Sequence, residues 1–413
     1  MVSALILVFL ALSLGYIFSE ISKRLGLPRV VGQIFTGLIL GVPIIKDYLL
    51  GEENLKIFSF LANLGIILLF YYVGLETNFR AFTKNIKELA LISFFNTAIP
   101  LILGILIMKF VFGFTALISI IIGICLAVSA QSVSLDILEE MKALKSRIGN
   151  LIIGAGAVDD IIEIVLVAVI FSLFQVAVSH QSLLQLLLEI LIFLVIIIAS
   201  RNWIIPYGLS YFDREKSSTA RFTGSLLIVI LIASLAEFLG LGLILGAMIA
   251  GIIVRQTIFG EKKIPDWEEH DIANSVHLFS FGFLIPLFFV WVGMNADLTL
   301  IGSQIGFILL LLVISIVGTV GGSLIAVLLS GGQWREGWIV GWGLTPKGDI
   351  ELVIAALALS SGIISTGIFT SLVITAFLTT VISSIMFKKL LGKTKSKLKG
   401  KAKIIKDRSH SVS

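Results

Sequence analysis

The sequence predicts an all-α polytopic membrane protein with about thirteen transmembrane helices. Three observations lead to this fold class: the apolar composition, the alternation of basic loops, and an internal repeat. Of the 413 residues, 57% are hydrophobic and only 14% are charged. Apolar runs repeatedly reach the roughly 20 residues that a helix needs to cross about 30 Å of hydrocarbon, which excludes an ordinary soluble fold.

Charged or Pro/Gly-rich breaks separate these runs and set the limits of each expected helix. The expected spans are 2–18, 28–45, 55–75, 88–111, 113–138, 147–175, 183–207, 220–238, 240–256, 273–294, 301–330, 336–360 and 364–387. They form one membrane domain over residues 1–390, and a basic tail follows over residues 391–413. The tail is expected to lie on anionic membrane lipid rather than on nucleic acid.

The basic residues test this count independently, because short cytoplasmic loops hold most Lys and Arg residues. The loops after the odd-numbered spans, together with the tail, hold almost all of the 31 Lys and Arg residues. The opposite loops hold only Lys46, Lys56 and Lys109, and Lys347 lies inside a span. The pattern predicts a protein of the cell (inner) membrane with its N-terminus outside and its C-terminus in the cytoplasm.

Two segments of the first half recur in the second half. The segment GLPRVVGQIFTGLIL (26–40) recurs as GLGLILGAMIAGIIV (240–254), and FYYVGLETNF (70–79) recurs as FVWVGMNADL (289–298). Seven spans separate the copies, and an odd number places them in opposite orientations in the bilayer. The sequence therefore predicts an inverted-topology repeat, which is common in secondary transporters, with repeat one at about 28–175 and repeat two at about 240–387.

Polar stretches interrupt the fifth and twelfth spans, which are matching positions of the two repeats. The fifth contains Ser129-Ala130-Gln131-Ser132, and the twelfth contains GLTPKGDIEL (343–352). Non-helical backbone is tolerated in a membrane only where it is buried in protein or lines a watery cavity. The sequence therefore predicts two crossed discontinuous helices with a substrate site near the midplane.

The sixth span carries Asp159 and Asp160 about a third of the way along, with Glu163 one turn later. A charge at the bilayer centre costs about 2.5 to 3.5 kcal/mol, so intramembrane acids are functional by default. A carboxylate that loses its proton when a hard monovalent cation arrives would couple two fluxes at one place. The alternative is that both aspartates are ion-paired or cap a helix.

Asp159 and Asp160 are about 100° apart on the helix, so they cannot face one ligand equally. We expect Na⁺ to bind at this pair, with Asp160 as the principal ion and proton carrier and Asp159 as its modulating partner. Glu163 either shares the face of Asp160 or is a structural acid paired with a base. The neutral oxygens of Ser129, Gln131 and Ser132 suit Na⁺, although such groups also form helix–helix hydrogen bonds.

Lys347 is expected to compensate the charge of a buried acid. The candidate partners are Asp349, Glu351, Glu163 and Asp159. A purely structural ion pair is the alternative, because an unpaired buried charge is costly whatever its role.

The chain resembles the monovalent cation:proton antiporters, in the branch that holds NapA-type sodium/proton antiporters and Kef-type potassium efflux systems. The resemblance covers about residues 4–390 and rests on LGLPRVVGQIFTGLILG, LGIILLFYYVGLE, GAVDDIIEI, LGAMIAGIIV, PLFFVWVGMNADL and TPKGDIELV, which resemble the family's blocks in the same order. It implies that Asp159 and Asp160 are the family's acid pair and that Lys347-Gly348-Asp349 is its basic-Gly-acidic segment. Relatives often place a lysine in the eleventh span, where this chain has Thr319, which puts a two-proton stoichiometry in doubt.

The resemblance also implies a NapA-like fold that works as a homodimer. The core domain would be about 88–175 and 301–387, the dimerisation domain about 1–75 and 208–294, and the linker helix about 183–207. The function predicted from the residues and the resemblance is exchange of Na⁺, with Li⁺ or K⁺ as further cations, for H⁺ by alternating access, without a cofactor and without enzymatic chemistry. The alternatives are a sodium-coupled solute symporter, a K⁺ efflux antiporter and a channel.

Overall fold

A computed structural model of the chain describes residues 4–49, 51–76, 86–179, 191–193, 195, 197–198, 218–239, 241–259, 274–348 and 350–410. These residues form helices and the turns between them, with no strand in the described ranges. Helices lie over twelve of the expected spans. The seventh, 183–207, lies almost entirely outside the described residues, so the total of thirteen stays a prediction.

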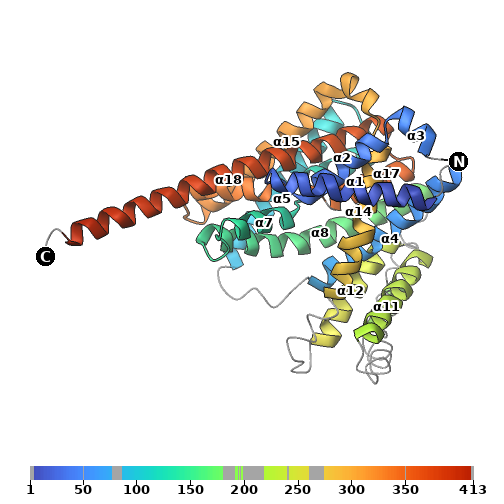
Figure 1. The fold of residues 1–413 in the computed structure, drawn as a ribbon, viewed down its shortest axis with the longest axis horizontal. Helices are drawn as coiled ribbons and strands as arrows, with labels where there is room; N and C mark the ends of the chain where they lie inside the picture. The colour runs from blue at the N-terminus through green and yellow to red at the C-terminus, as the bar shows by residue number, and fades with distance from the viewer. Residues whose placement is uncertain are drawn as a thin grey trace.

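Figure 1 shows how the helices are arranged. Their bounds are α1 Ala4–Arg24, α2 Arg29–Leu40, α3 Pro43–Leu49, α4 Glu52–Glu76, α5 Ile86–Phe110, α6 Ala116–Ala127, α7 Gln131–Glu140, α8 Arg147–Ser179, α11 Ser218–Phe238, α12 Leu243–Phe259, η2 Ser280–Leu284, α14 Ile285–Asn295, η3 Leu298–Leu300, α15 Ile301–Leu329, α16 Trp334–Leu344, α17 Ile350–Ser360 and α18 Thr366–His410. Within the described ranges, seven helical segments are long and apolar enough to cross a membrane. The all-helical, multi-pass fold class is confirmed.

Two expected helix limits are wrong. The span predicted over 28–45 ends at Leu40, and α3 begins separately at Pro43. Proline lacks the N–H that would continue α2, but it is well suited to the first turn of a new helix. The last span was expected to end at 387, whereas α18 continues through the basic tail to His410 and extends beyond the bundle in Figure 1.

The helices pack in two groups. In one group, α2 packs against α1 and α14, α4 packs against α12 and α14, and α11 packs against α12. In the other, α5 packs against α6, α8 and α15, and α15 also packs against α16 and α18. The half-helix α17 lies against α6 and α18 of the second group. The acidic residues of α8 therefore belong to the second group.

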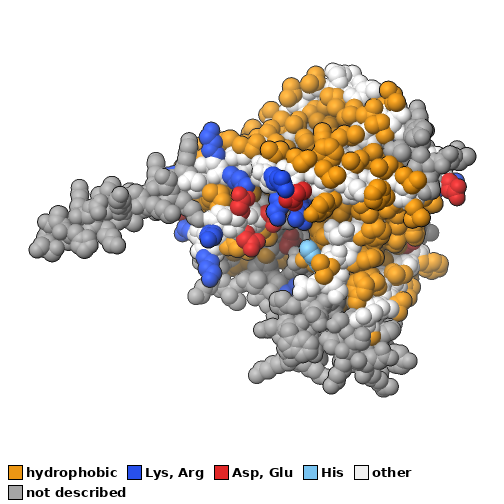
Figure 2. Space-filling view, viewed as in Figure 1, with side chains coloured by type: hydrophobic (Ala, Val, Ile, Leu, Met, Phe, Trp, Pro, Cys, Tyr) orange, Lys and Arg blue, Asp and Glu red, His pale blue; other side chains and the backbone are white. Residues whose placement is uncertain are grey.

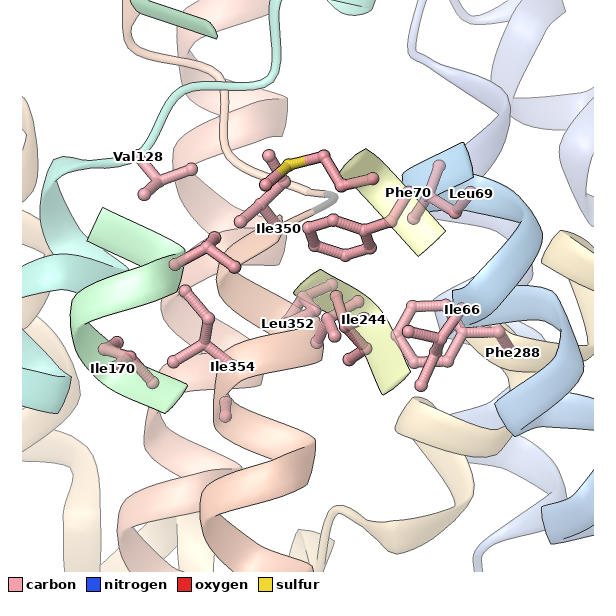
Figure 3. Packing of buried hydrophobic residues seen from close by; sticks show 14 of the residues in the cluster. Ile66, Leu69, Phe70, Val128, Ile170, Ile244, Phe288, Ile350, Leu352 and Ile354 are labelled. Carbon is pink, nitrogen blue, oxygen red and sulfur yellow. The ribbon is translucent and has the colours of Figure 1, made fainter. Parts of the chain in front are cut away.

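Apolar side chains from both groups meet in the largest hydrophobic cluster. Figure 3 shows Leu352 and Ile354 of α17 between Ile170 of α8 on one side and Ile244 and Phe288, from α12 and α14, on the other. These residues are at most 4% exposed, apart from the neighbouring Ile350 at 7%. The interface between the two groups is thus apolar beside the break that precedes α17.

Two close helix crossings depend on pairs of glycines. Gly37 of α2 meets Gly293 of α14, and Gly74 of α4 meets Gly251 of α12. A Cβ atom at any of the four would overlap a backbone carbonyl oxygen of the facing helix. The sequence repeat aligns Gly37 with Gly251 and Gly74 with Gly293. One contact therefore occurs twice with the helices exchanged, which supports the proposed repeat.

Both predicted helix interruptions are present. The fifth span divides into α6 and α7 between Ala127 and Gln131, and the twelfth divides into α16 and α17 between Leu344 and Ile350. The two breaks meet, because the Ala130 N–H donates to the Pro346 carbonyl oxygen at 2.8 Å. Pro346 has no N–H of its own, so its segment cannot continue the helical pattern of α16.

Candidate functional site

The three acids of α8 lie in different surroundings. Asp159 and Glu163 are 1% and 4% exposed, whereas Asp160 is partly exposed. Residues four apart share a helix face, and adjacent residues are turned by about 100°. Glu163 is therefore buried as Asp159 is, and it lies one turn from both aspartates.

Three side chains of α5 donate hydrogen bonds to Asp159. The Ser93 hydroxyl donates to Oδ1 at 2.5 Å, the Thr97 hydroxyl donates to the same oxygen at 3.4 Å, and the Asn96 amide donates to Oδ2 at 3.1 Å. The three donors are buried, with at most 6% exposure. Sequence reasoning missed them. Their i, i+3, i+4 spacing within an otherwise apolar helix was the signal that could have found them.

Asp160 faces the first residue of α7. The Gln131 side-chain amide donates to Asp160 Oδ1 at 3.0 Å and to the Gly156 carbonyl oxygen at 2.5 Å. A Cβ at Gly156 would overlap the Gln131 side chain, so glycine leaves the space that Gln131 occupies. Ser132, which the sequence also placed at the site, is exposed on α7.

Ser129 joins Glu163 to the environment of Asp159. Its backbone N–H donates to Glu163 Oε1 at 3.0 Å, and its hydroxyl oxygen lies 3.4 Å from the donating Asn96 amide. The Glu163 carboxylate thus lies at the N-terminal end of α7, where the helix dipole favours negative charge. A continuous polar network runs from α5 through Asp159 to the break before α7.

Lys347 lies at the point where the two broken helices cross. Its ammonium group donates to the carbonyl oxygens of Ala127 at 3.2 Å and Val128 at 2.5 Å. These carbonyls end half-helix α6, where the dipole favours positive charge. The backbone of Lys347 is fixed as well, because its N–H donates to the Thr380 hydroxyl of α18 at 3.0 Å, and that hydroxyl donates back to the Lys347 carbonyl.

Three of the four acids proposed as partners of Lys347 interact with its charge. Glu351, Glu163 and Asp159 are all close enough to attract the charge of Lys347, and the Lys347 residue is 2% exposed. The fourth candidate, Asp349, lies outside the described residues. The arrangement differs from a simple ion pair, since the hydrogen bonds of the ammonium go to a helix end while the acids supply the compensating charge.

Comparison with known families decides what kind of protein carries this site. The family model described as "Sodium/hydrogen exchanger, transmembrane" matches residues 8–393. The chain belongs to the sodium/hydrogen exchanger family. Among its relatives, a protein named Na(+)/H(+) antiporter from Enterococcus hirae is 30% identical over 94% of this chain and 97% of its own length. The Na(+)/H(+)-K(+) antiporter GerN of Bacillus cereus is 29% identical over 90% of this chain and 92% of its own length.

A solved structure has the same fold. The sodium proton antiporter MjNhaP1 from Methanocaldococcus jannaschii, determined at pH 8, superposes with a TM-score of 0.64 at 17% sequence identity. The match covers 94% of this chain and 99% of that one. The exchanger fold therefore extends over nearly the whole molecule.

In this member of the exchanger family, Thr319 lies fully buried in α15. Its neighbours Gly318 and Gly322 pack against Pro100 and against Phe95 and Asn96 of α5, as expected of small residues that let helices approach. This contact sets the position of the helix that donates to Asp159. Thr319 itself brings no charge to the core.

Proposed function

We propose that this exchanger trades Na⁺ for H⁺ at Asp160, with Asp159 as the supporting carboxylate. The observation that carries the proposal is the difference between the two aspartates. Asp159 is buried among three donors of α5, whereas Asp160 is partly exposed and has the Gln131 amide beside it. A carboxylate that exchanges ions must be reachable from water, and the partial exposure of Asp160 supports this role for it.

The exchange step is a simple competition at one carboxyl group. When Na⁺ binds, the Asp160 O–H bond breaks, the proton leaves to water, and the ionised oxygen ligates the cation. The reverse step on the other side of the membrane releases Na⁺ and restores the O–H bond. Carboxylate, amide and hydroxyl oxygens suit a hard monovalent cation. We assign further oxygens to Gln131 and Ser129, and Ser132 can join them only if α7 turns.

The charges at the helix crossing help to stabilise ionised Asp160 within the membrane when neither a proton nor Na⁺ is bound to it. Lys347 binds the negative end of α6, Glu163 lies at the positive end of α7, and Glu351 is buried nearby. The Lys347 ammonium already donates to two carbonyl oxygens, so it is poorly placed to bind an organic anion. This observation favours a cation exchanger over a solute symporter.

The two packing groups support a moving core on a fixed scaffold. We propose that the group with α5, α8 and α15 carries the ion past the group with α2, α4, α12 and α14, and that the latter forms a homodimer. Figure 2 shows apolar side chains over most of the visible face, with charged side chains gathered where α1, α7 and α18 approach one another. We assign this charged end, from which α18 continues, to the cytoplasmic surface of the cell membrane.

Potassium is the second candidate cation. The relative GerN is named as an antiporter of Na⁺ and K⁺, and a relative in Saccharomyces cerevisiae, 27% identical over 86% of this chain, is named K(+)/H(+) antiporter 1. The chain covers 43% of the length of that yeast relative. K⁺ is therefore included in the test beside Na⁺.

The experiment uses the full chain reconstituted in liposomes that contain a pH-sensitive dye and carry an imposed pH gradient. Addition of Na⁺, Li⁺ or K⁺ in separate samples is expected to collapse the gradient, with Na⁺ effective at the lowest concentration. Protein-free liposomes and choline chloride serve as controls. A gradient that none of the three cations changes would overturn the proposed exchange.

A further inference from the structure

Asp159 is held by a set of donors built into one face of α5. Ser93, Asn96 and Thr97 occupy positions i, i+3 and i+4, and each donates to the Asp159 carboxylate. An ionised carboxylate is purely an acceptor, and hydrogen bonds to it are stronger than bonds between neutral groups. The Asn96 amide nitrogen can only donate and both hydroxyls are able to donate, so this set can satisfy the ionised form of Asp159.

The packing of α5 holds the three donors close to Asp159. The α5 backbone around them is fixed against α15, because a Cβ at Gly318 or Gly322 would overlap α5. Asn96 is also engaged with the Ser129 hydroxyl, which ties it to the break before α7. The donor set is part of the second packing group, to which Asp159 also belongs.

We infer that Ser93, Asn96 and Thr97 are positioning residues that hold Asp159 as a fixed anion through the whole transport cycle, so that Asp160 alone exchanges its proton. The inference rests on the proposed exchange at Asp160 and specifies its stoichiometry. The other charged groups near Asp159 are Asp160 and Glu163 on α8 and Lys347 at the crossing. In the inferred cycle, Glu163 and Lys347 keep the same protonation state throughout, and Asp160 alone changes its own.

This arrangement sets the charge that the moving core carries. With a proton on Asp160, the two aspartates and their ligand sum to one negative charge. With Na⁺ on ionised Asp160, they also sum to one negative charge. The core therefore carries the same charge in both directions, and one Na⁺ is exchanged for one H⁺ without net charge movement. If Asp159 also took a proton, the two directions would differ by one charge.

The test measures the zero-flux condition in liposomes that contain the full chain. A Na⁺ gradient is fixed, the membrane potential is set by a gradient of the permeant anion thiocyanate in the absence of K⁺, and the pH difference at which net Na⁺ flux vanishes is recorded. For the wild-type chain we expect that pH difference to be independent of the potential. Two protons per Na⁺ would instead shift it by about half a pH unit for each 59 mV.

The variant Ser93→Ala/Thr97→Val removes two donors and nearly preserves side-chain volume. Asp159 then becomes able to take a proton, and the zero-flux pH difference is expected to move with the potential, most strongly at acidic pH. The matched control is Ser119→Ala, which removes a buried hydroxyl that bonds within α6. We expect this control to behave as the wild-type chain does.

A potential-dependent zero-flux point in the wild-type chain would overturn the inference, and so would a functional double variant with none. The wild-type measurement requires no substitution and decides the charge of Asp159 even if the variant does not fold. Failure of the proposed function is recognised separately. In that case the wild-type chain exchanges no cation, or exchange persists in Asp160→Asn.

Discussion

Replacement of Asp160 with asparagine lowers Na⁺-driven proton movement by on the order of 100-fold or more. The amide has nearly the same size and can still accept a hydrogen bond from Gln131, which contacts Asp160 in the native chain. It cannot release a proton, and it provides no negative charge for the cation. Dye fluorescence in liposomes measures the loss, with Na⁺ added at a series of concentrations so that a change in affinity is distinguished from a loss of turnover.

The control for this variant is Glu139→Gln, which neutralises an exposed acid near the end of α7. We expect it to exchange Na⁺ at the wild-type rate. The two variants remove the same charge from the protein, so a shared loss would indicate a general electrostatic effect. Full exchange in Asp160→Asn would show that the shared ion and proton site has been placed on the wrong residue.

Replacement of Lys347 with alanine destabilises the core by about 3 to 5 kcal/mol, the usual cost of leaving buried charges without their partner. The Ala127 and Val128 carbonyl oxygens lose their donor, and Glu163, Glu351 and Asp159 lose their compensating charge. Thermal unfolding of the purified chain in detergent measures the loss, and we expect exchange in liposomes to fall with it.

Two further variants separate the role of the buried ammonium from that of a basic residue in general. Lys347→Arg keeps the charge and is expected to recover most of the stability. Lys388→Ala removes a lysine that is paired with Glu140 of α7 at 2.5 Å, where Glu140 is 63% exposed. Exposed pairs contribute about 1 kcal/mol or less, so this variant should unfold near the wild-type temperature. Equal destabilisation by Lys347→Ala and Lys388→Ala would contradict the assigned role.

The acids and the helix breaks were predictable because each has a local signal. Asp159 and Asp160 are conspicuous in an apolar run, and Pro346 removes a backbone donor whatever its surroundings. The donors to Asp159 were not predicted, since Ser93, Asn96 and Thr97 are ordinary residues for a membrane helix. Only the packing of α5 against α8 turns them toward the carboxylate.

The hydrogen-bond acceptors of the Lys347 ammonium were likewise not predictable from the sequence. From the sequence we expected an acid, because an acid is the usual partner of a buried base. The structure gives the hydrogen bonds to carbonyl oxygens of Ala127 and Val128 instead. Those oxygens are available only because α6 ends there, and the identity of the helix end that meets Lys347 depends on how the two breaks cross.

The most direct test of the shared site is proton release when Na⁺ binds to the purified protein. The chain is placed in weakly buffered detergent solution with a pH indicator, and NaCl or choline chloride is added. We expect release of about one proton for each Na⁺ bound by the wild-type chain, because a cation and a proton compete for one carboxylate. We expect no release from Asp160→Asn. Absence of release from a wild-type chain that binds Na⁺, or undiminished release from the variant, would contradict exchange at Asp160.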